Sequence, residues 1–153
     1  VVDQQGSVAR VLLEAGEAWS EQGGGSSGAL WGIGLAAAGN ALAAADRLAP
    51  EALAGAVTAT LGAIQTLGMA QAGDKTLVDA LIPFSDRLSG GIAKGEPAAK
   101  TWSEAASCAA EAAQATATLL PQRGRARSHG ARSVGHPDPG AVSLARVLVA
   151  VQG

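Results

Sequence analysis

Apolar residues recur along this chain every three or four positions, which is the spacing of one face of an α-helix. Two stripes show the pattern: Val8, Val11, Leu12, Ala15 and Trp19, and then Leu53, Val57, Leu61, Ile64 and Leu67. No segment alternates between apolar and polar residues as a half-buried strand does. The pattern therefore predicts an all-α fold with about six helices, near residues 7–20, 28–47, 51–68, 76–90, 98–119 and 139–151.

The composition agrees with that prediction. Of the 153 residues 48% are hydrophobic, but only four are aromatic, namely Trp19, Trp31, Phe84 and Trp102. The core must then be built mainly from alanine, leucine and valine, and an alanine-rich core favours helices over strands. A chain of this length usually forms one domain, so residues 1–153 are predicted to be a single helical domain.

Charge and cysteine content narrow the class of protein. The formal net charge of −2 at pH 7 argues against a protein that binds nucleic acid or a membrane through bulk electrostatics. Cys108 is the only cysteine, so the chain forms no internal disulfide, which fits a reducing, cytoplasmic compartment. Neither a signal peptide nor an apolar run of about 18 residues is evident, so we expect no association with a membrane.

The joints before three of the predicted helices are rich in glycine or in charge. They are Gly24-Gly25-Ser26-Ser27-Gly28, Gly73-Asp74-Lys75-Thr76, and residues 121–138, where positions 123–132 hold four of the eleven lysines and arginines. A helix N-terminus offers unpaired N–H groups and about half a positive charge, so it suits a phosphate group. We expect the helix starts near 28, 76 and 139 to lie together at one end of the fold and to form a phosphate site.

Each joint also has an ordinary interpretation. Ser26 and Ser27 suit a plain N-cap after a flexible turn, and Asp74 suits a cap for the helix that follows it. The pair Asp138-Pro139 is what any helix start prefers, and an arginine in the loop can be a surface charge. The occurrence of three such starts in one small chain favours the phosphate site.

Other chemistries find less support. His129 and His136 stand in a loop without a cysteine or a group of acids nearby, so a zinc site is not expected. Residues 73–76 lack the earlier glycine and the preceding strand of a P-loop, and no strand precedes Gly23 as in a Rossmann fold. Cys108 lies among alanines, as a small core residue does. The arginines of the long loop lack the interleaved aromatic residues of an RNA-binding segment.

Three segments occur in a characteristic order along the chain. They are GGSSGALWG at 24–32, GDKTLVDAL at 73–81, and GRA at 124–126 followed by RSVGHPDPGA at 132–141. Together they resemble the nucleotide-binding domain of dihydroxyacetone (glycerone) kinases, which is the C-terminal half of single-chain ATP-dependent enzymes and the L subunit of phosphotransferase-linked bacterial ones. The resemblance extends over essentially the whole chain and implies a barrel of mainly antiparallel helices that binds ADP or ATP at one end.

The resemblance also implies roles for individual residues. Ser26 and Ser27 would contact the nucleotide phosphates. Gly68 and Leu77 would line the adenine and ribose pocket, and Arg125 would contact the nucleotide from the long loop.

Two further groups of residues belong to the matching motifs. Asp138, Pro139 and Gly140 would close over the nucleotide. Lys75, Thr76 and Asp79 match the second motif, but the resemblance assigns no contact to any of them, and no catalytic residue can be assigned in this chain.

One part of the family pattern does not match. The family carries an N-terminal loop of closely spaced aspartates that hold Mg²⁺ against the nucleotide phosphates, whereas here Asp3 is the only acid before Glu14. We therefore expect a chain that lacks the first two of the family's eight helices, leaves Trp19 on the wall of an exposed apolar groove, and has no metal ligands of its own. Because phosphoryl transfer needs metal ions to neutralise charge, such a chain would be inactive by itself.

Three hypotheses about function remain at this stage. The chain is the nucleotide-binding part of a kinase for dihydroxyacetone or a related small ketose, whose partners are a ketose-binding subunit or domain and, in one type, a phosphocarrier protein. Alternatively, it is a non-catalytic helical remnant that binds nucleotide weakly or not at all. A related kinase with another substrate, such as erythrulose or a fatty acid, is the third, and the ending Asp138-Pro139-Gly140-Ala141 argues against the fatty-acid branch.

The first prediction concerns Arg125. A charged contact to phosphate in a partly dry site contributes about 1.5–3 kcal/mol, so replacing Arg125 by alanine should weaken ADP binding roughly ten- to a hundredfold. Arg146→Ala, outside the motifs, should leave the affinity unchanged, and added Mg²⁺ should help little. Calorimetric titration with ADP measures each effect, and tight binding that depends on Mg²⁺ would contradict the expectation that metal ligands are absent.

Overall fold

Six α-helices make up the part of the chain that the structure describes, and the prediction of an all-α protein is confirmed. The computed structural model describes residues 4–123, 130 and 132–151, and it contains no strand within them. The helices are α1 (Gln4–Gln22), α2 (Gly25–Ala44), α3 (Pro50–Gly68), α4 (Val78–Ala93), α5 (Ala98–Ala115) and α6 (Pro139–Ala150), with the short 3-10 helix η1 (Thr116–Thr118) after α5. They group into two compact units, Val1–Met69 and Ala70–Gly153, and the expectation of a single domain stays a prediction.

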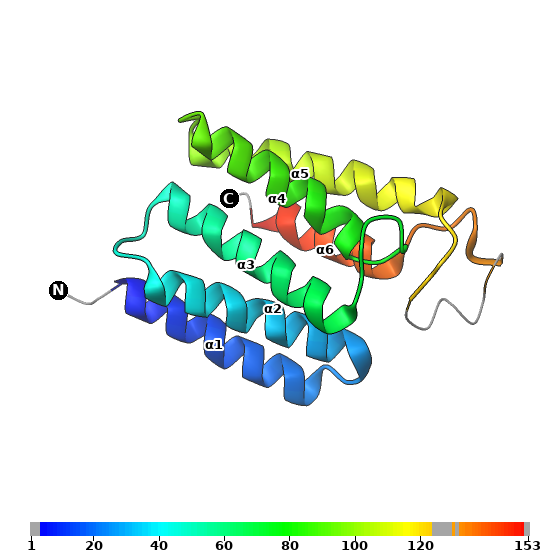
Figure 1. Ribbon diagram of the computed structural model, residues 1–153, viewed down its shortest axis with the longest axis horizontal. Helices are drawn as coiled ribbons and strands as arrows, with labels where there is room; N and C mark the ends of the chain where they lie inside the picture. The colour runs from blue at the N-terminus through cyan, green and yellow to red at the C-terminus, as the bar shows by residue number, and fades with distance from the viewer. Residues whose placement is uncertain (1–3, 124–129, 131, 152–153) are drawn as a thin grey trace. The chain divides into compact units, whose positions relative to one another are not determined.

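The first unit is a three-helix array in which α2 packs against both α1 and α3, and successive helices run in alternating directions (Figure 1). Its core is small and consists mainly of alanine: Ala9, Leu42, Ala54, Ala56 and Ile64. Such small side chains bring the helix axes close together.

Glycines set the spacing between α1 and α2. A Cβ atom on Gly32 would lie 2.8 Å from the carbonyl oxygen of Gly16, and a Cβ on Gly16 would lie equally close to the carbonyl of Gly32. On the other side, the Thr60 hydroxyl of α3 lies 3.1 Å from the Gly34 carbonyl oxygen and donates across the interface. The backbone of α2 therefore lies close to both of its neighbours, to the backbone of α1 on one side and to a side chain of α3 on the other.

The composition of α2 has a second consequence. Gly25–Ala44 is long and apolar enough, with a mean hydropathy of 1.2, to cross a membrane by length and composition alone. The expectation that the chain holds no such run is therefore wrong. The run arises because the middle helix of this unit carries glycine and alanine in place of charged residues, and the core helix of a soluble protein passes the same test.

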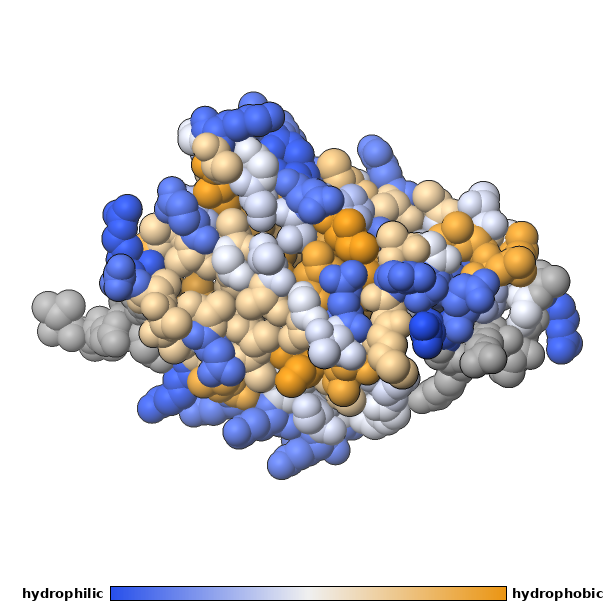
Figure 2. All heavy atoms as spheres, in the orientation of Figure 1, coloured by the Kyte–Doolittle hydropathy of each residue, from blue (hydrophilic) through white to orange (hydrophobic). Residues whose placement is uncertain are grey.

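Large apolar side chains also reach the surface of the first unit. Trp19 is 48% exposed, and its ring lies 5.7 Å from that of Trp31 in a tilted arrangement. Val8, Val11 and Ile33 are exposed as well. Figure 2 shows that hydrophobic residues break the polar surface on the face drawn. The expected exposure of Trp19 is thus observed.

The second unit packs α4, α5 and α6 against one another, again in alternating directions (Figure 1). Phe84 and Leu88 of α4 are fully buried, and so are the alanines Ala105, Ala109 and Ala113 of the adjoining helix α5. The Trp102 ring meets Phe84 edge to face at 4.9 Å, and its Nε1 donates to the Leu148 carbonyl oxygen at 3.0 Å. This one indole therefore ties α5 to both of its neighbours.

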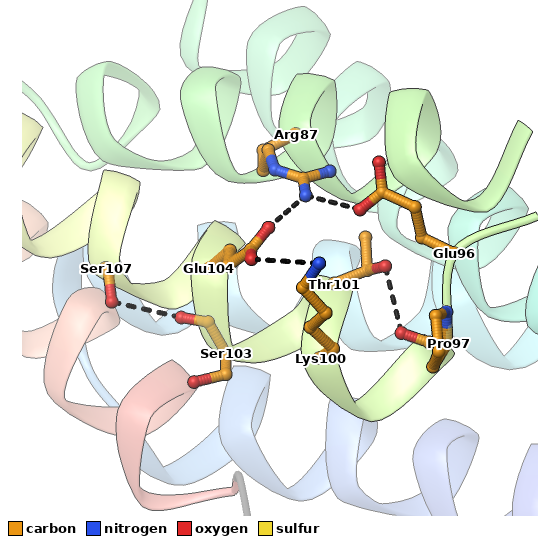
Figure 3. A network of polar contacts seen from close by, with 8 residues as sticks. All are labelled: Arg87, Glu96, Pro97, Lys100, Thr101, Ser103, Glu104 and Ser107. Carbon is orange, nitrogen blue, oxygen red and sulfur yellow. Dashed lines mark hydrogen bonds and ion pairs between the residues drawn. The ribbon is translucent and has the colours of Figure 1, made fainter. Parts of the chain in front are cut away.

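An ionic network links α4 to α5 near the turn that joins them (Figure 3). The Arg87 guanidinium donates to Glu96, at 2.6 Å, and to Glu104, and Lys100 Nζ lies 3.7 Å from Glu104. The hydrogen bond from Arg87 lowers the pKa of Glu96. These groups are partly solvated, so the network orients the helix pair more than it stabilises it.

Replacing each of two adjacent glycines of α4 by alanine should change stability in opposite directions. A Cβ on Gly91 would lie 2.5 Å from Cγ2 of the fully buried Thr101, so Gly91→Ala should destabilise the unit by about 1–3 kcal/mol through overpacking. A Cβ on Gly90 meets nothing, so Gly90→Ala should raise the unfolding free energy by about 0.4–1 kcal/mol. Urea unfolding of both variants checks this, and equal effects would contradict the packing of α4 on α5.

Candidate functional site

The start of α2 is open. Its cap is Gly24, which has a φ of 56° and makes no capping hydrogen bond because it has no side chain, and Gly25 has a φ of 62°. The first backbone N–H groups of a helix have no acceptor within it. Ser26 and Ser27 follow at once and are exposed. The expected start at residue 28 is therefore three residues late, and both serines lie inside the first turn rather than before it.

The turn between α1 and α2 is compact. The amide of Gly23 donates to the Trp19 carbonyl oxygen at 2.8 Å, and the amide of Gly28 to the Gly24 carbonyl at 3.3 Å. A Cβ on the buried Gly28 would lie 3.0 Å from the backbone carbon of Gly23. The end of α1 thus supports the exposed first turn of α2 from one side.

The start of α4 is closed by its own side chains. Both Asp79 carboxylate oxygens accept backbone amides, Oδ1 from Gly73 at 2.6 Å and Oδ2 from Thr76 at 2.7 Å. The Thr76 hydroxyl accepts from the amide of Val78 at 3.2 Å. The motif residues Thr76 and Asp79 therefore shape this turn and accept three of its backbone amides, those of Gly73, Thr76 and Val78.

Asp74 is not the cap of α4, which corrects the sequence-based assignment. Lys75 adopts a left-handed backbone with φ of 61°, so no helix can run through it, and α4 begins three residues later, at Val78. The Asp74 carboxylate is buried instead, where its Oδ2 accepts from the Gln71 amide at 3.0 Å and from Arg123 Nε at 3.4 Å.

Lys75 also differs from expectation, because it is not a solvated residue of a first turn. Its side chain is 2% exposed, and Nζ donates to the carbonyl oxygens of Leu119, at 3.1 Å, and Ser133, at 2.7 Å. This lysine therefore bonds to the connection between α5 and α6.

The start of α6 is closed as well. Asp138 caps it, since Oδ2 accepts from the amide of Ala141 at 2.8 Å, and the backbone amide of Asp138 donates to Thr116 Oγ1 at 2.7 Å. The Val142 amide bonds to the Asp138 carbonyl at 3.0 Å, and Pro139 has no N–H. The predicted cap and first-residue pair is thus confirmed, and the donors of this turn are used.

Burial is the main influence on the pKa of Asp138. Its side chain is 9% exposed, and this desolvation raises the pKa of the carboxyl group. Hydrogen bonds from the amides of Ala141 and Gly140 and the charge of Lys75 oppose the rise, whereas the charge of Asp79 adds to it. The carboxylate therefore lies within the electrostatic reach of the α4 start.

The starts of α4 and α6 lie side by side, as the sequence predicts. A Cβ on Gly140 would lie 3.6 Å from Cβ of Leu77 and 3.0 Å from Asp138 Oδ2. Leu77 itself is buried. The start of α2 belongs to the other unit, and its place beside these two stays a prediction.

Of two further site residues that the resemblance implies, Gly68 and Arg125, the structure describes only Gly68. Gly68 is the last residue of α3 and is half-buried, beside Met69, which has a φ of 48° and is exposed. Arg125 lies outside the described residues.

The described residues do not suit a magnesium site. No group of three or more His, Cys, Asp or Glu side chains lies together among them. The carboxylates of the matching motifs, Asp74, Asp79 and Asp138, all accept backbone amides. The metal implied by the resemblance has no fitting ligands in this part of the chain.

The sequence missed two residues of this region. Thr116 is 1% exposed and accepts the Asp138 amide, and Arg123 pairs with Asp74 across 49 residues. A threonine at the end of an amphipathic helix carries no signal of such a contact. For Arg123 the only signal was its place in the arginine-rich segment.

These features define a helical protein in which α2 begins without a side-chain cap on an exposed glycine-serine turn, and such a turn suits an anion such as a nucleotide phosphate. The model of the DAK2 domain family matches residues 2–153. The chain belongs to the DAK2 domain family, the family of the dihydroxyacetone kinase nucleotide-binding domain, and the resemblance found in the sequence is confirmed.

Known proteins of this family are similar along most of the chain. It is 43% identical over 151 residues to an L-erythrulose kinase of Pectobacterium atrosepticum, which covers 99% of this chain and 26% of that protein. It is 35% identical over 121 residues to the ADP-binding subunit DhaL of the PEP-dependent dihydroxyacetone kinase of Escherichia coli, covering 79% of this chain and 58% of the subunit.

A solved structure supports the fold. The dihydroxyacetone kinase of C. freundii superposes with a TM-score of 0.70 at 28% identity, over 95% of this chain and 23% of that one. The chain thus spans about a quarter of the length of the erythrulose kinases that it matches.

The raised pKa of Asp138 gives a prediction about pH. A carboxyl group whose pKa is higher in the folded than in the unfolded state holds its proton more readily when folded, so it stabilises the fold as the pH falls. From neutral pH down toward the ordinary aspartate pKa of about 4, the unfolding free energy of the wild type should rise relative to that of Asp138→Asn, which keeps a good cap.

Urea unfolding of both proteins between these pH values measures the difference. Asp86→Asn, at an exposed position of α4, controls for the loss of one negative charge. A wild type that instead loses stability relative to Asp138→Asn on acidification would show that the Asp138 carboxyl is not desolvated.

Proposed function

We propose that this chain is the nucleotide-binding domain of a kinase that phosphorylates a small ketose, with dihydroxyacetone or erythrulose as the substrate class. The observation that carries the proposal is the family match over residues 2–153, together with similarity to kinases of erythrulose and to an ADP-binding kinase subunit. The bound molecule would be ADP or ATP.

The uncapped start of α2 supports the part of the proposal that concerns binding of the nucleotide phosphates. Backbone amides in its first turn and the hydroxyls of Ser26 and Ser27 are donors, and the helix dipole adds partial positive charge. Positive φ at Gly24 and Gly25 allows a phosphate to approach without a Cβ in its way. Ser26 and Ser27 would therefore hold the phosphates.

The remaining site residues would act on the rest of the nucleotide. Gly68 and Leu77 would line the adenine and ribose pocket, and Arg125 would add a positive charge. Asp138, Pro139 and Gly140 would cover the nucleotide by packing, because the α6 amides already bond to Asp138. Lys75, Thr76 and Asp79 would not contact the nucleotide but would fix the turn before α4.

The proposal implies partners. Since the chain spans about a quarter of the erythrulose kinases, the ketose would be held by another domain or subunit, and a PEP-dependent system would add a phosphocarrier protein. Mg²⁺, where bound, would neutralise phosphate charge. We propose that these 153 residues alone bind nucleotide without transferring its phosphoryl group, since the described carboxylates near the helix starts are occupied by amides.

The serine hydroxyls provide the test. Each hydrogen bond to a phosphate contributes about 0.5–1.5 kcal/mol, so Ser26→Ala and Ser27→Ala should each weaken ADP binding roughly two- to tenfold. Ser107→Ala, an exposed serine of α5 that bonds only to the nearby Ser103 carbonyl among the bonds described, is the matched control. Calorimetric titration measures all three.

Two results would count against the proposal. One is a wild type that binds no ADP at millimolar concentration. The other is a loss of affinity in Ser107→Ala as large as that in the two α2 variants.

A further inference from the structure

Lys75 combines two costly features. It is 2% exposed although it is a lysine, and its backbone lies in the left-handed region with φ of 61° although it has a side chain. Lysine is almost never buried without partners, and a left-handed backbone is unfavourable for any residue but glycine. A residue that keeps both features is held in place by its surroundings.

Its partners lie far along the chain. Nζ donates to the carbonyl oxygens of Leu119, 44 residues on, and Ser133, 58 residues on. Leu119 ends η1, and Ser133 precedes the start of α6. We call these two hydrogen bonds the Lys75 clamp. They fasten both described ends of the α5–α6 connection to the turn before α4.

Further bonds join the same three segments. The Gln122 amide donates to the Asp74 carbonyl oxygen at 3.0 Å, and Arg123 pairs with the Asp74 carboxylate. The Gly135 amide donates to the Ala117 carbonyl at 2.8 Å, and the Asp138 amide donates to Thr116 Oγ1. Each of these bonds lies within a few residues of Lys75, Leu119 or Ser133, so the Lys75 clamp lies at the centre of the contacts that join the three segments.

We propose that Lys75 is a positioning residue for nucleotide binding: the Lys75 clamp fixes the segment that leads to Asp138 and Gly140 against the start of α4. The proposal rests on the proposed function. It assigns a role to a motif residue that neither the sequence nor the resemblance could place.

The geometry excludes the simpler role of a phosphate ligand. Two of the three ammonium donors are already bonded to carbonyl oxygens, and the side chain is almost fully buried. A phosphate would have to break the clamp to reach Nζ. Lys75 acts on the nucleotide through Asp138 and Gly140, which lie at the end of the segment that it holds.

The test compares Lys75→Met with Lys94→Met, an exposed lysine at the end of α4. Both remove one positive charge and keep a long apolar stem. In calorimetric titrations of the chain with ADP, Lys75→Met should raise Kd by about tenfold with unchanged stoichiometry, since residues along a coupled network modulate affinity by about that much. Lys94→Met should bind like the wild type.

Amide hydrogen exchange gives a second result that needs no nucleotide. In Lys75→Met the amides of Gln122, Gly135 and Asp138 should exchange faster, because the segments that they join are released. The amides of Ala105 and Ala109, in the buried centre of α5, should exchange as in the wild type. If the wild type binds no ADP, the proposed function fails, and the exchange rates still decide whether the clamp holds these segments.

Three outcomes would overturn the proposal. The first is an unchanged Kd with a lower stoichiometry, as expected for a lysine that affects only the fraction of folded protein. The second is unchanged exchange at Gln122, Gly135 and Asp138. The third is loss of protection at Ala105 and Ala109 in both Lys75→Met and the milder Lys75→Gln, which would make Lys75 a residue of the core.

Discussion

The first backbone amides of a helix have no acceptor within it, and the starts of α2, α4 and α6 differ in the side chains that could accept them. At α4 the Thr76 hydroxyl accepts the Val78 amide, while Asp79 accepts amides of the turn before the helix. At α6 Asp138 caps the helix. At α2 a glycine stands at the cap and offers no side chain. The proposed phosphate site follows from that difference, because only an unused donor is available to an anion.

The starts of α4 and α6 also have a structural role. Asp79 and Thr76 accept amides in the turn before α4, and Lys75 extends from this turn to Leu119 and Ser133. Asp138 completes the arrangement from the other side, where burial raises the pKa of its carboxyl group. These bonds join the neighbouring starts of α4 and α6. Under the proposed function, they would hold residues 138–140 where these residues could cover a nucleotide.

The sequence predicted the helices well because their signal is local. Apolar spacing and alanine content identified all six, whereas their ends depended on single backbone conformations. Lys75 at positive φ delays α4 to Val78, and the cap at Gly24 allows α2 to begin before its serines. The roles of Lys75 and Thr116 could not be predicted, because their partners are a backbone amide and carbonyls 22 to 58 residues away, and no residue type marks these.

The central claim is that phosphate groups bind at the α2 start and not at the two closed starts. Amide chemical shifts of the chain, titrated in turn with adenosine, AMP and ADP, test it most directly. Each added phosphate should increase the shift changes of the Ser26, Ser27 and Gly28 amides, while those of Thr76, Val78 and Ala141 should not depend on phosphate number. Shifts that grow with phosphate number at Thr76 or Ala141, and not at Ser26 and Ser27, would contradict it.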